Sequence, residues 1–330
     1  MTLTRRQMLG GSTVAAGWAL GVLPAGAQGA NDYPTKDIKA ICNFPAGTGA
    51  DIFVRFYAER LSAITGKNVL VDNRGGAFGN IATEAAAKSK PDGYTILITP
   101  ASSTMASAVH TFKKLGFDPL KDFTPVTTLS KLSFIILVDP KSPIKTVADL
   151  TAYEKAKPGK ASYGVNSNTG LITAELYNKL SGAGATKIQY KDNQTILNDL
   201  FAGQVDFISM DVPWATEQVK TGKLRALAVS GKDRAGSLPD VPTMEEAGIK
   251  GYGSVEPWWA VFVPAGTPQP VVDRLESLFN RIVASDEAKK FLSNLGSDSF
   301  PGNAKMLQAL LSSEVQRWGE LIKLAGIEPQ

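Results

Sequence analysis

Short apolar runs that alternate with helical segments constrain the fold of this chain more than any other feature of its sequence. Between residues 50 and 65, for example, Phe53, Tyr57, Leu61 and Ile64 recur at three- and four-residue steps, as in a helix that buries one face. Strand-like runs that alternate with such helices are typical of parallel, doubly wound sheets, so we expect an α/β fold. The strand-like runs are residues 38–42, 68–71, 94–99, 134–138, 161–165, 187–190, 205–209, 224–229 and 258–263.

The length of the chain predicts two lobes joined by a hinge. Without an N-terminal leader about 300 residues remain, which exceeds what one hydrophobic core usually serves. The long runs at 123–140 and 254–264 are candidates for segments that cross between lobes, and two crossings make a hinge. We therefore expect lobe one at residues 31–131 plus 255–330 and lobe two at residues 132–254.

The last third of the chain differs from the rest, because it has helical periods but no strand-like run. We expect these helices to pack on the outside of lobe one. They are residues 268–285, 286–295 and 304–325.

Residues 1–27 predict an export signal. Arg5 and Arg6 precede a weakly apolar run at 10–23, and the residues Pro-Ala-Gly-Ala before position 28 suit a signal peptidase. Paired arginines favour the twin-arginine route, with the general secretory route as the alternative. No later segment approaches the ~20 apolar residues that span a bilayer. We expect cleavage near Ala27 and a soluble protein in the periplasm.

Charge and rare residue types exclude several classes of function. The chain has 35 basic and 31 acidic residues, and no basic block or basic–aromatic pattern indicates a nucleic-acid or membrane surface. Cys42 is the single cysteine, so no disulfide or CxxC site can form, and we expect it in the core. His110 is the single histidine and is expected to be exposed at a helix end. With one histidine, the chain cannot form a His-rich metal site, and most catalytic schemes that depend on histidine are excluded.

The loop NFPAGTGAD, residues 43–51, joins the first predicted strand to the first predicted helix. Ile52 stands where a dinucleotide fingerprint needs a small residue, and no Gly-Lys-Ser/Thr ending follows, so we expect no cofactor. The loop instead offers backbone N–H groups at a helix start, where unpaired amides and the helix dipole favour an anion. Gly47 and Gly49 allow close approach, and a valine at Gly49 would strain any positive-φ backbone there.

Two further loops have the same form, TPASST at 99–104 and NSNTG at 166–170. We name residues 43–51, 99–104 and 166–170 the first, second and third loops. In an open α/β sheet such loops lie beyond the carboxyl ends of the strands, so they should converge on the cleft between the lobes. None of them contains Lys or Arg, which favours a small carboxylate held by amides, hydroxyls and water. Phosphate and sulfate sites look similar, and each loop alone is also explained by ordinary N-capping.

Two aspartates near these loops have ambiguous roles. Asp51 lies in the first helical turn, where a carboxylate also serves as a capping and dipole partner, and we favour that structural role. Asp211 precedes Pro213 and should point at the same cleft, where it would repel an anion unless a ligand or nearby amides hydrogen-bond to it. Trp258 and Trp259 alternate along a crossing strand, so at most one of these rings faces the cleft.

Segments along nearly the whole chain resemble the Bug-type, TctC-like solute-binding proteins of tripartite tricarboxylate transporters. The segments that carry the resemblance are ICNFPAGTGADIFVR, VDNRGGAFGNIATEAAAKSKPDGYTIL, ASYGVNSNTGLITAELY, YKDNQTILNDLFAGQVDF, GKLRALAVSGKDR, LPDVPTMEEAG and VFVPAGTPQPVVDRL. The chain departs from the family pattern with Pro-Ala-Gly-Thr-Gly at 45–49 for Pro-Gly-Gly, Ile172-Thr173 for His-Leu, and Asp192 after Tyr-Lys for Gly. These departures bear on ligand choice more than on fold.

The resemblance implies a two-lobed, type II-like periplasmic binding protein fold whose closed cleft holds a carboxylate, partly through ordered water. Carried onto this chain, the expected ligand-binding residues are Phe44, Ala46, Gly47, Thr48, Gly49 and Asp51 in the first loop, Ser102 and Ser103 at the second, Ser167, Asn168, Thr169 and Gly170 at the third, and Asp211.

The favoured interpretation is a monomeric periplasmic receptor that captures a small organic carboxylate and delivers it to the membrane subunits of such a transporter. The ligand class stays open between dicarboxylates and aromatic acids such as terephthalate. Aromatic acids are suggested by side chains near the loops, namely Phe44, Phe78, Trp214 and Trp258.

The alternative is an exported enzyme that acts on a carboxylate substrate through Asp51, Asp211 or Glu256. No nucleophile–base pair or metal set accompanies these carboxylates, so we expect no catalytic residue and no enzyme.

Overall fold

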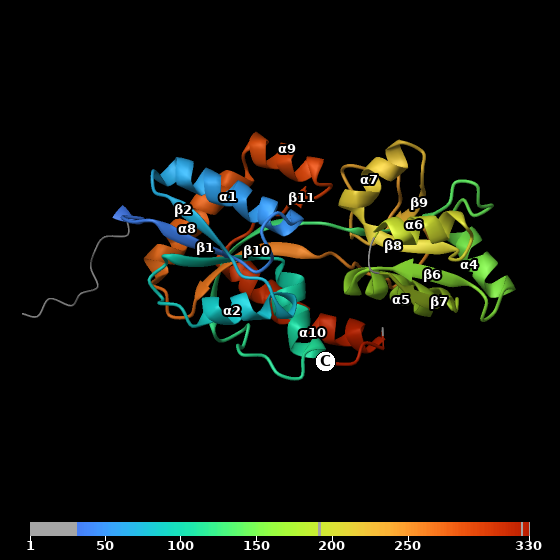
Figure 1. Cartoon of the computed structure of the whole chain (residues 1–330), viewed down its shortest axis with the longest axis horizontal. Coiled ribbons are helices and arrows are strands. Elements are labelled where there is room, and N and C mark those ends of the chain that lie inside the picture. Colours follow the sequence, from blue (N-terminus) through green and yellow to red (C-terminus); the bar gives the residue numbers. More distant parts are fainter. Residues whose placement is uncertain (1–31, 191–192, 325, 330) are drawn as a thin grey trace, which may run out of the picture.

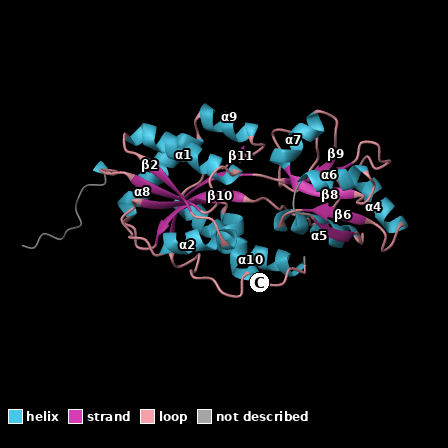
Figure 2. Ribbon diagram, viewed as in Figure 1, coloured by secondary structure: helices cyan, strands magenta, loops and turns pink. Residues whose placement is uncertain are grey.

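The computed structural model describes residues 32–190, 193–324 and 326–329, and it contains two β-sheets flanked by helices (Figures 1 and 2). The larger sheet has six strands in the order β11-β4-β10-β3-β1-β2, and the smaller has five in the order β7-β6-β8-β5-β9. We call the bodies around them lobe one and lobe two. The α/β prediction is confirmed. In sheet order the strands are β11 (Asp298–Ser299), β4 (Phe123–Lys131), β10 (Trp258–Pro264), β3 (Thr95–Thr99), β1 (Ile38–Cys42) and β2 (Val69–Asn73), then β7 (Thr186–Gln189), β6 (Ser162–Val165), β8 (Phe207–Asp211), β5 (Phe134–Val138) and β9 (Arg225–Val229).

Helices cover both sheets, and their ends follow from local chemistry. The first begins after the N-cap residue Thr48, whose side chain accepts a hydrogen bond from the Asp51 N–H, and ends at Gly66, which adopts φ 66°. Lobe one carries α1 (Gly49–Thr65), the 3-10 turn η2 (Ala77–Gly79), α2 (Asn80–Ala87), the π-helical turn η3 (Ser102–Ser107), α3 (Ala108–Thr111), α8 (Gln269–Val283), α9 (Asp286–Asn294) and α10 (Ala304–Leu324). Lobe two carries α4 (Val147–Ala156), α5 (Asn168–Ser181), α6 (Asn193–Phe201) and α7 (Val212–Lys220).

Both sheets are mixed, whereas the sequence predicted parallel sheets. β1 runs parallel to β2 and β3, but β10 is antiparallel to β3 and β4, and β5 is antiparallel to β8 and β9. The antiparallel strands belong to the two segments that cross between lobes. A strand whose chain arrives from the other lobe begins at the end of the sheet that faces that lobe. It therefore runs antiparallel to neighbouring strands whose carboxyl ends lie there.

Strand register places the carboxyl ends of the parallel strands between the lobes. β4 ends at Lys131, β5 begins at Phe134, and the pairs Ala260↔Thr99 and Phe134↔Asp211 put the ends of β3 and β8 beside this crossing. The loops that follow β1, β3, β6 and β8 therefore face the opposite lobe, as the sequence predicted.

The two crossing segments are hydrogen-bonded to one another. The Leu132 N–H donates to the Pro257 carbonyl at 3.0 Å. The Ser230 hydroxyl, just after β9, bridges the two segments: it accepts from the Phe134 N–H at 2.9 Å and donates to the Val255 carbonyl at 2.6 Å. The Lys131 ammonium lies 3.0 Å from the Glu256 carboxylate, with both side chains mostly shielded from solvent. The crossing is therefore a pair of coupled strands.

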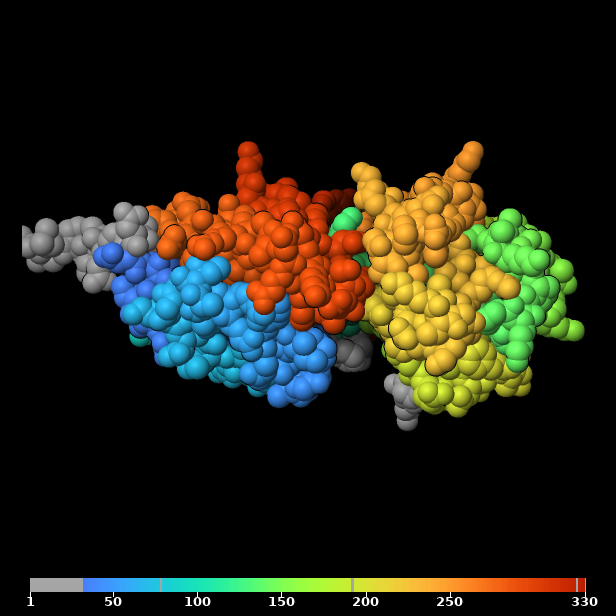
Figure 3. All heavy atoms as spheres, turned by 90° about the horizontal axis from the view of Figure 1, so that it is seen from above, coloured from blue at the N-terminus to red at the C-terminus, as the bar shows by residue number. Residues whose placement is uncertain are grey.

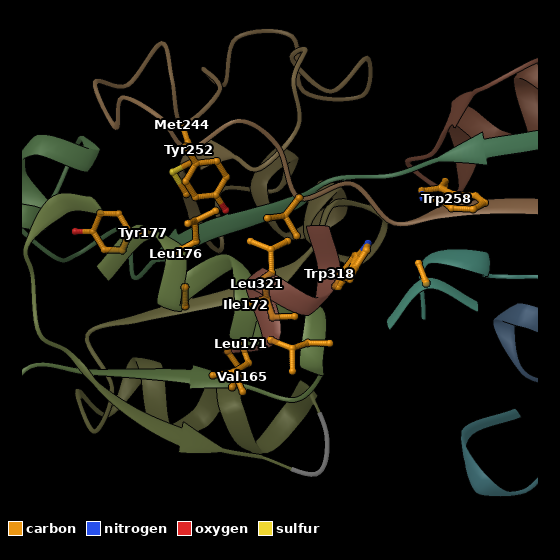
Figure 4. Packing of buried hydrophobic residues seen from close by; sticks show 14 of the residues in the cluster. Val165, Leu171, Ile172, Leu176, Tyr177, Met244, Tyr252, Trp258, Trp318 and Leu321 are labelled. Atoms are coloured by element: carbon orange, nitrogen blue, oxygen red, sulfur yellow. The ribbon is translucent and has the colours of Figure 1, made fainter. Parts of the chain in front are cut away.

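The C-terminal helix α10 contacts both lobes, which corrects the expectation that it packs only on lobe one. Its residues Trp318 and Leu321 belong to the same buried cluster as Leu171 and Ile172 of α5, and Figure 4 shows these side chains gathered together. The sequence also missed β11, which is two residues long and has no hydrophobic run. Cys42 is fully buried, as predicted.

The predicted export signal at residues 1–27 lies outside the described residues. Within the described part of the chain, no helix is long and apolar enough to cross a membrane.

Candidate functional site

A cavity of about 430 Å³ lies between the lobes, and both lobes contribute to its lining. In the space-filling view a groove separates the two bodies (Figure 3). Lobe two supplies the start of α5, and lobe one supplies η3, α3 and the end of α10. The lining residues are Phe44, Ser103, Ser107, Thr111, Phe112, Asn166, Ser167, Asn168, Thr169, Ile172, Gln189, Trp318, Ile322 and Ile327.

The first loop is closed by its own hydrogen bonds, and only Phe44 of its predicted residues lines the cavity. The Gly47 N–H donates to Asp51 at 2.9 Å, and the Thr48 hydroxyl donates to the Pro45 carbonyl at 2.7 Å. Gly47 has φ 81°, whereas Gly49 has neither a positive φ nor any atom near an added Cβ. The backbone conformation therefore requires glycine at Gly47. A side chain at Gly49 would not be strained by a positive φ, contrary to the possibility raised from the sequence. Ala46, Gly47, Thr48 and Gly49 lie outside the lining.

The Asp51 carboxylate accepts three hydrogen bonds from within lobe one. Arg55 donates to it at 2.9 Å and Asn73 at 2.8 Å, in addition to the Gly47 N–H. Burial alone would raise the pKa of Asp51, but the hydrogen bonds from Arg55, Gly47 and Asn73 outweigh burial and hold the pKa below its ordinary value. This geometry agrees with the structural role favoured from the sequence.

The second loop contributes one serine to the cavity and one to the fold. The Ser102 side chain is buried, and its hydroxyl oxygen accepts a hydrogen bond from the backbone N–H of Trp258 at 3.1 Å. Ser102 therefore joins η3 to β10. The Ser103 hydroxyl is exposed, donates to the Pro100 carbonyl at 2.9 Å and lines the cavity. A π-helical turn such as η3 is frequent at functional sites.

The third loop presents the first turn of α5 to the cavity. Ser167 is the N-cap and accepts from the Gly170 N–H at 3.1 Å. The N–H groups of Asn168 and Thr169 have no intrahelical acceptor at these positions, so the helix start is suited to an anion. Gly170 lies outside the lining, and an added Cβ there would be 2.8 Å from the Ser209 carbonyl oxygen. Its role is close packing of α5 on β8.

Asp211 lies at the end of β8 but outside the cavity lining. It is the N-cap of α7 and accepts from the Trp214 N–H at 2.9 Å. Burial raises the pKa of Asp211 above its ordinary value. Glu256, the third carboxylate considered for catalysis, is held by Lys131 at the crossing.

Of the aromatic residues considered for ligand contact, Phe44 alone lines the cavity among those whose side chains are described. Trp258 is buried in the cluster that contains α10, and Trp259 packs on Phe53 in another cluster, with ring centroids 4.3 Å apart. Their rings thus lie on opposite faces of the sheet, as predicted. Trp214 is half-buried within lobe two, and the side chain of Phe78 lies outside what the structure describes.

Sequence reasoning missed the part of the cavity that α3 and α10 build. Ser103, Ser107 and Thr111 recur every four residues, and this spacing was a usable signal for one helical face. Trp318, Ile322 and Ile327 come from the far end of the chain, where nothing local predicts contact with the third loop. The missed lining residues are Ser107, Thr111, Phe112, Asn166, Ile172, Gln189, Trp318, Ile322 and Ile327.

His110 connects α3 to α10, which corrects the expectation that it is exposed. Its Nε2 lies 2.7 Å from the Val315 carbonyl oxygen, and the ring is half-buried. Gly319 makes room for it, because an added Cβ there would be 2.6 Å from the ring. The single histidine thus fixes the helix that closes one end of the cavity.

Among the residues that the structure describes, those lining the cavity include no charged side chain. Within the described ranges, no group of three or more His, Cys, Asp or Glu residues could hold a metal ion. The lining offers hydroxyls, amides and a helix N-terminus at one part and apolar side chains at another, which suits a small organic anion.

Comparisons with known proteins agree with this geometry. Residues 53–327 match the family model of the tripartite tricarboxylate transporter family receptor. The protein BugT of Bordetella pertussis is 31% identical over 300 residues, which are 90% of this chain and 91% of BugT. The structure of R. palustris Rpa4515 with adipate superposes with a TM-score of 0.75 at 32% identity, covering 90% of this chain and all of that chain.

A structure of the periplasmic binding protein BugD superposes with a TM-score of 0.71 at 31% identity, again over 90% of this chain and all of that one. The two-sheet fold is therefore that of the periplasmic binding proteins, and the chain belongs to the tripartite tricarboxylate transporter receptor family.

Proposed function

We propose that this protein is a periplasmic receptor that captures a small organic carboxylate in the interlobe cavity and delivers it to the membrane subunits of a tripartite tricarboxylate transporter. The observation that carries the proposal is a cavity whose lining comes from both lobes. Its described residues offer hydroxyls, amides and a helix N-terminus and no charged side chain. The similarity to a protein whose structure holds adipate supports the ligand class.

The carboxylate is held at the start of α5 in this proposal. The free N–H groups of the first turn and the helix dipole favour a negative charge there, and the effect is strongest where water is excluded. Ser103 and Ser107 supply hydroxyls from the opposite lobe. Because contacts come from both lobes, the ligand favours the arrangement in which the lobes are close together.

The first loop has a supporting role in this scheme. Apart from Phe44, its predicted residues stabilise the start of α1 and lie outside the lining. Direct contacts from Ala46 through Gly49 would need the lobes to move relative to one another, so we keep these residues as ligand-binding candidates for the closed state.

An exported enzyme is the less favoured function. Asp51 is paired with Arg55, Asp211 caps α7, and Glu256 is paired with Lys131. None of these three carboxylates lines the cavity. General acid–base chemistry needs such a group within hydrogen-bond reach of the substrate. Export by the twin-arginine route, cleavage near Ala27 and a monomeric state remain parts of the proposal.

A thermal-shift screen tests the proposal with adipate, terephthalate, benzoate and hexanoate, and with hexylamine as the cationic match to hexanoate. We expect at least one carboxylate to raise the melting temperature and hexylamine to leave it unchanged. A ligand at 100 times its dissociation constant stabilises by about 2.7 kcal/mol, which such a screen detects. The bound acid should be recovered unchanged after incubation. Stabilisation by none of the acids, or conversion of a bound acid, would contradict the receptor.

A further inference from the structure

The lining of the interlobe cavity is polar where the second and third loops contribute and mostly apolar where the C-terminal part of the chain contributes, and we call these parts the polar end and the apolar end. Asn166 through Thr169 and Ser103 form the polar end, where the second and third loops meet. Phe112, Trp318, Ile322 and Ile327 form the other end, beside Ile172 one turn into α5. Ser103, Ser107 and Thr111 follow one helical face from the first end to the second, over roughly 10 Å.

Helix α10 is fixed in this position by contacts along its length. His110 binds the Val315 carbonyl at 2.7 Å, and Gly319 packs directly against the histidine ring. One turn further, Trp318 and Ile322 are 3% exposed within the cluster that includes Ile172 of lobe two. Figure 4 shows Trp318 and Leu321 beside Ile172. The C-terminal part of α10 is therefore held in place beside lobe two.

The helix end also folds one later residue back onto this part of α10. Gly326 has φ 63°, its N–H donates to the Lys323 carbonyl at 3.2 Å, and the Ile327 N–H donates to the Ile322 carbonyl at 3.1 Å. This is the Schellman pattern, in which the residue after the glycine packs on the last turn of the helix. Ile327 thereby joins Ile322 in the lining.

No cation serves the apolar end within the described residues. Lys323 lines a neighbouring hollow on the other side of Ile322 and Ile327, together with His110 and Glu328, and it is absent from the lining of the interlobe cavity. A carboxylate placed against the cavity side of Ile322 and Ile327 would lose hydration and gain no cationic partner among the lining residues, which is costly. An apolar group placed there gains roughly 0.8 kcal/mol for each buried methylene.

We propose that the C-terminal segment, Trp318, Ile322 and Ile327, is a specificity wall that selects carboxylates with an apolar body and a single charged end. The protein then prefers a monocarboxylate to the dicarboxylate of the same length. This inference rests on the proposed carboxylate receptor and narrows its ligand class.

Calorimetric titration with two matched pairs of acids tests the wall. Hexanoate and adipate have the same number of carbons, as do toluate and terephthalate, and each pair differs in one terminal group, a methyl or a carboxylate. We expect hexanoate to bind at least tenfold more tightly than adipate, and p-toluate at least tenfold more tightly than terephthalate.

Substitutions at Ile327 then assign the preference to the wall. Ile327 is only half-buried, so Ile327→Ala should leave the protein folded while weakening hexanoate about tenfold. Ile327→Lys places a cation at the apolar end and should raise the affinity for adipate relative to hexanoate at least tenfold. Ile81→Ala and Ile81→Lys are matched controls, because Ile81 is 55% exposed and outside the lining, and they should change neither affinity.

The outcomes separate this inference from the receptor itself. Binding of acids with no preference within a pair, or a preference that Ile327→Ala and Ile327→Lys leave unchanged, overturns the wall and leaves the receptor intact. Failure of all these acids to bind the wild type contradicts the receptor and the wall together.

Discussion

Ser102 and Ser103 are neighbours in the chain with different surroundings. Ser102 is 1% exposed and satisfies the buried N–H of Trp258, whereas Ser103 is exposed at the cavity. The family resemblance implied both as ligand-binding residues. It could not tell them apart, since the burial of Ser102 depends on β10, which lies 156 residues later in the chain.

This difference predicts unequal effects on stability. Ser102→Ala leaves the Trp258 N–H buried without an acceptor and should lower the free energy of unfolding by about 1–3 kcal/mol. Ser103→Ala should change it by less than about 0.5 kcal/mol, because the hydroxyl is exposed. Urea denaturation of the two variants measures both values. Equal effects would show that the hydrogen bond to β10 contributes nothing.

Glu154 of α4 predicts a pH dependence of stability. Its side chain is 2% exposed, Tyr177 donates to one oxygen at 3.3 Å, and the other oxygen has no partner among the described residues. Burial, with a smaller contribution from the charge of Asp206, raises the pKa of Glu154 from its ordinary 4.5 to about 8. The folded state therefore retains a proton that the unfolded state has released between these two values.

Stability from this group is full below pH 4.5 and falls as the pH rises to about 8. The decrease should amount to at most roughly 5 kcal/mol and should vanish in Glu154→Gln, which carries no ionisable group. Urea denaturation of both proteins from pH 5 to pH 8.5 provides the comparison. If wild type and variant lose stability in parallel, another group is responsible.

At the scale of elements, local sequence signals predict most of the strands, with β11 as an exception, and predict their partners poorly. The apolar run of β5 matched the observed strand because all five of its residues are buried. The antiparallel pairing of β10 and the contact of α10 with α5 depend on segments far apart in the chain, so periodicity could not predict them. The third loop was found because Ser167 and the following helical period are adjacent.

Two glycines at helix starts predict opposite responses to alanine. In Gly170→Ala the new Cβ would be 2.8 Å from the Ser209 carbonyl oxygen, so α5 must move away from β8. We expect a loss of about 1–3 kcal/mol, as for overpacked cores. Gly49→Ala has open space and an ordinary backbone, so it should be neutral or stabilise by up to about 1 kcal/mol. Urea denaturation compares them, and a tolerated Gly170→Ala would contradict the close packing of α5.

At the scale of the whole molecule, the lobes are joined by the two crossing segments and by packing between helices, and Gly296 of lobe one lies directly against Pro213 of lobe two. The crossing segments are hydrogen-bonded at Leu132 and Pro257, Lys131 is paired with Glu256, and α10 shares a hydrophobic cluster with α5. We expect the lobes to approach by bending at the crossing, with the contact between α10 and α5 as the pivot.

Ligand binding should therefore make the protein more compact. Contacts from η3 and from α5 are satisfied together only when the lobes are close. Small-angle X-ray scattering with and without saturating hexanoate should show a smaller radius of gyration in the bound state, with hexylamine as the control. Identical radii would mean that the cavity binds without movement of the lobes.

The central claim is that the interlobe cavity holds a carboxylate at the start of α5 without a charged partner among the described lining residues, and Asn168→Asp tests it most directly. This substitution keeps the shape of the side chain and places a negative charge in the first turn, where the helix dipole stabilises the fold by about 0.3–1 kcal/mol. The same charge repels a bound carboxylate. Calorimetric titration of hexanoate should give one binding site in the wild type and an affinity at least tenfold lower in a normally folded Asn168→Asp. Equal affinity in the two proteins would contradict the claim.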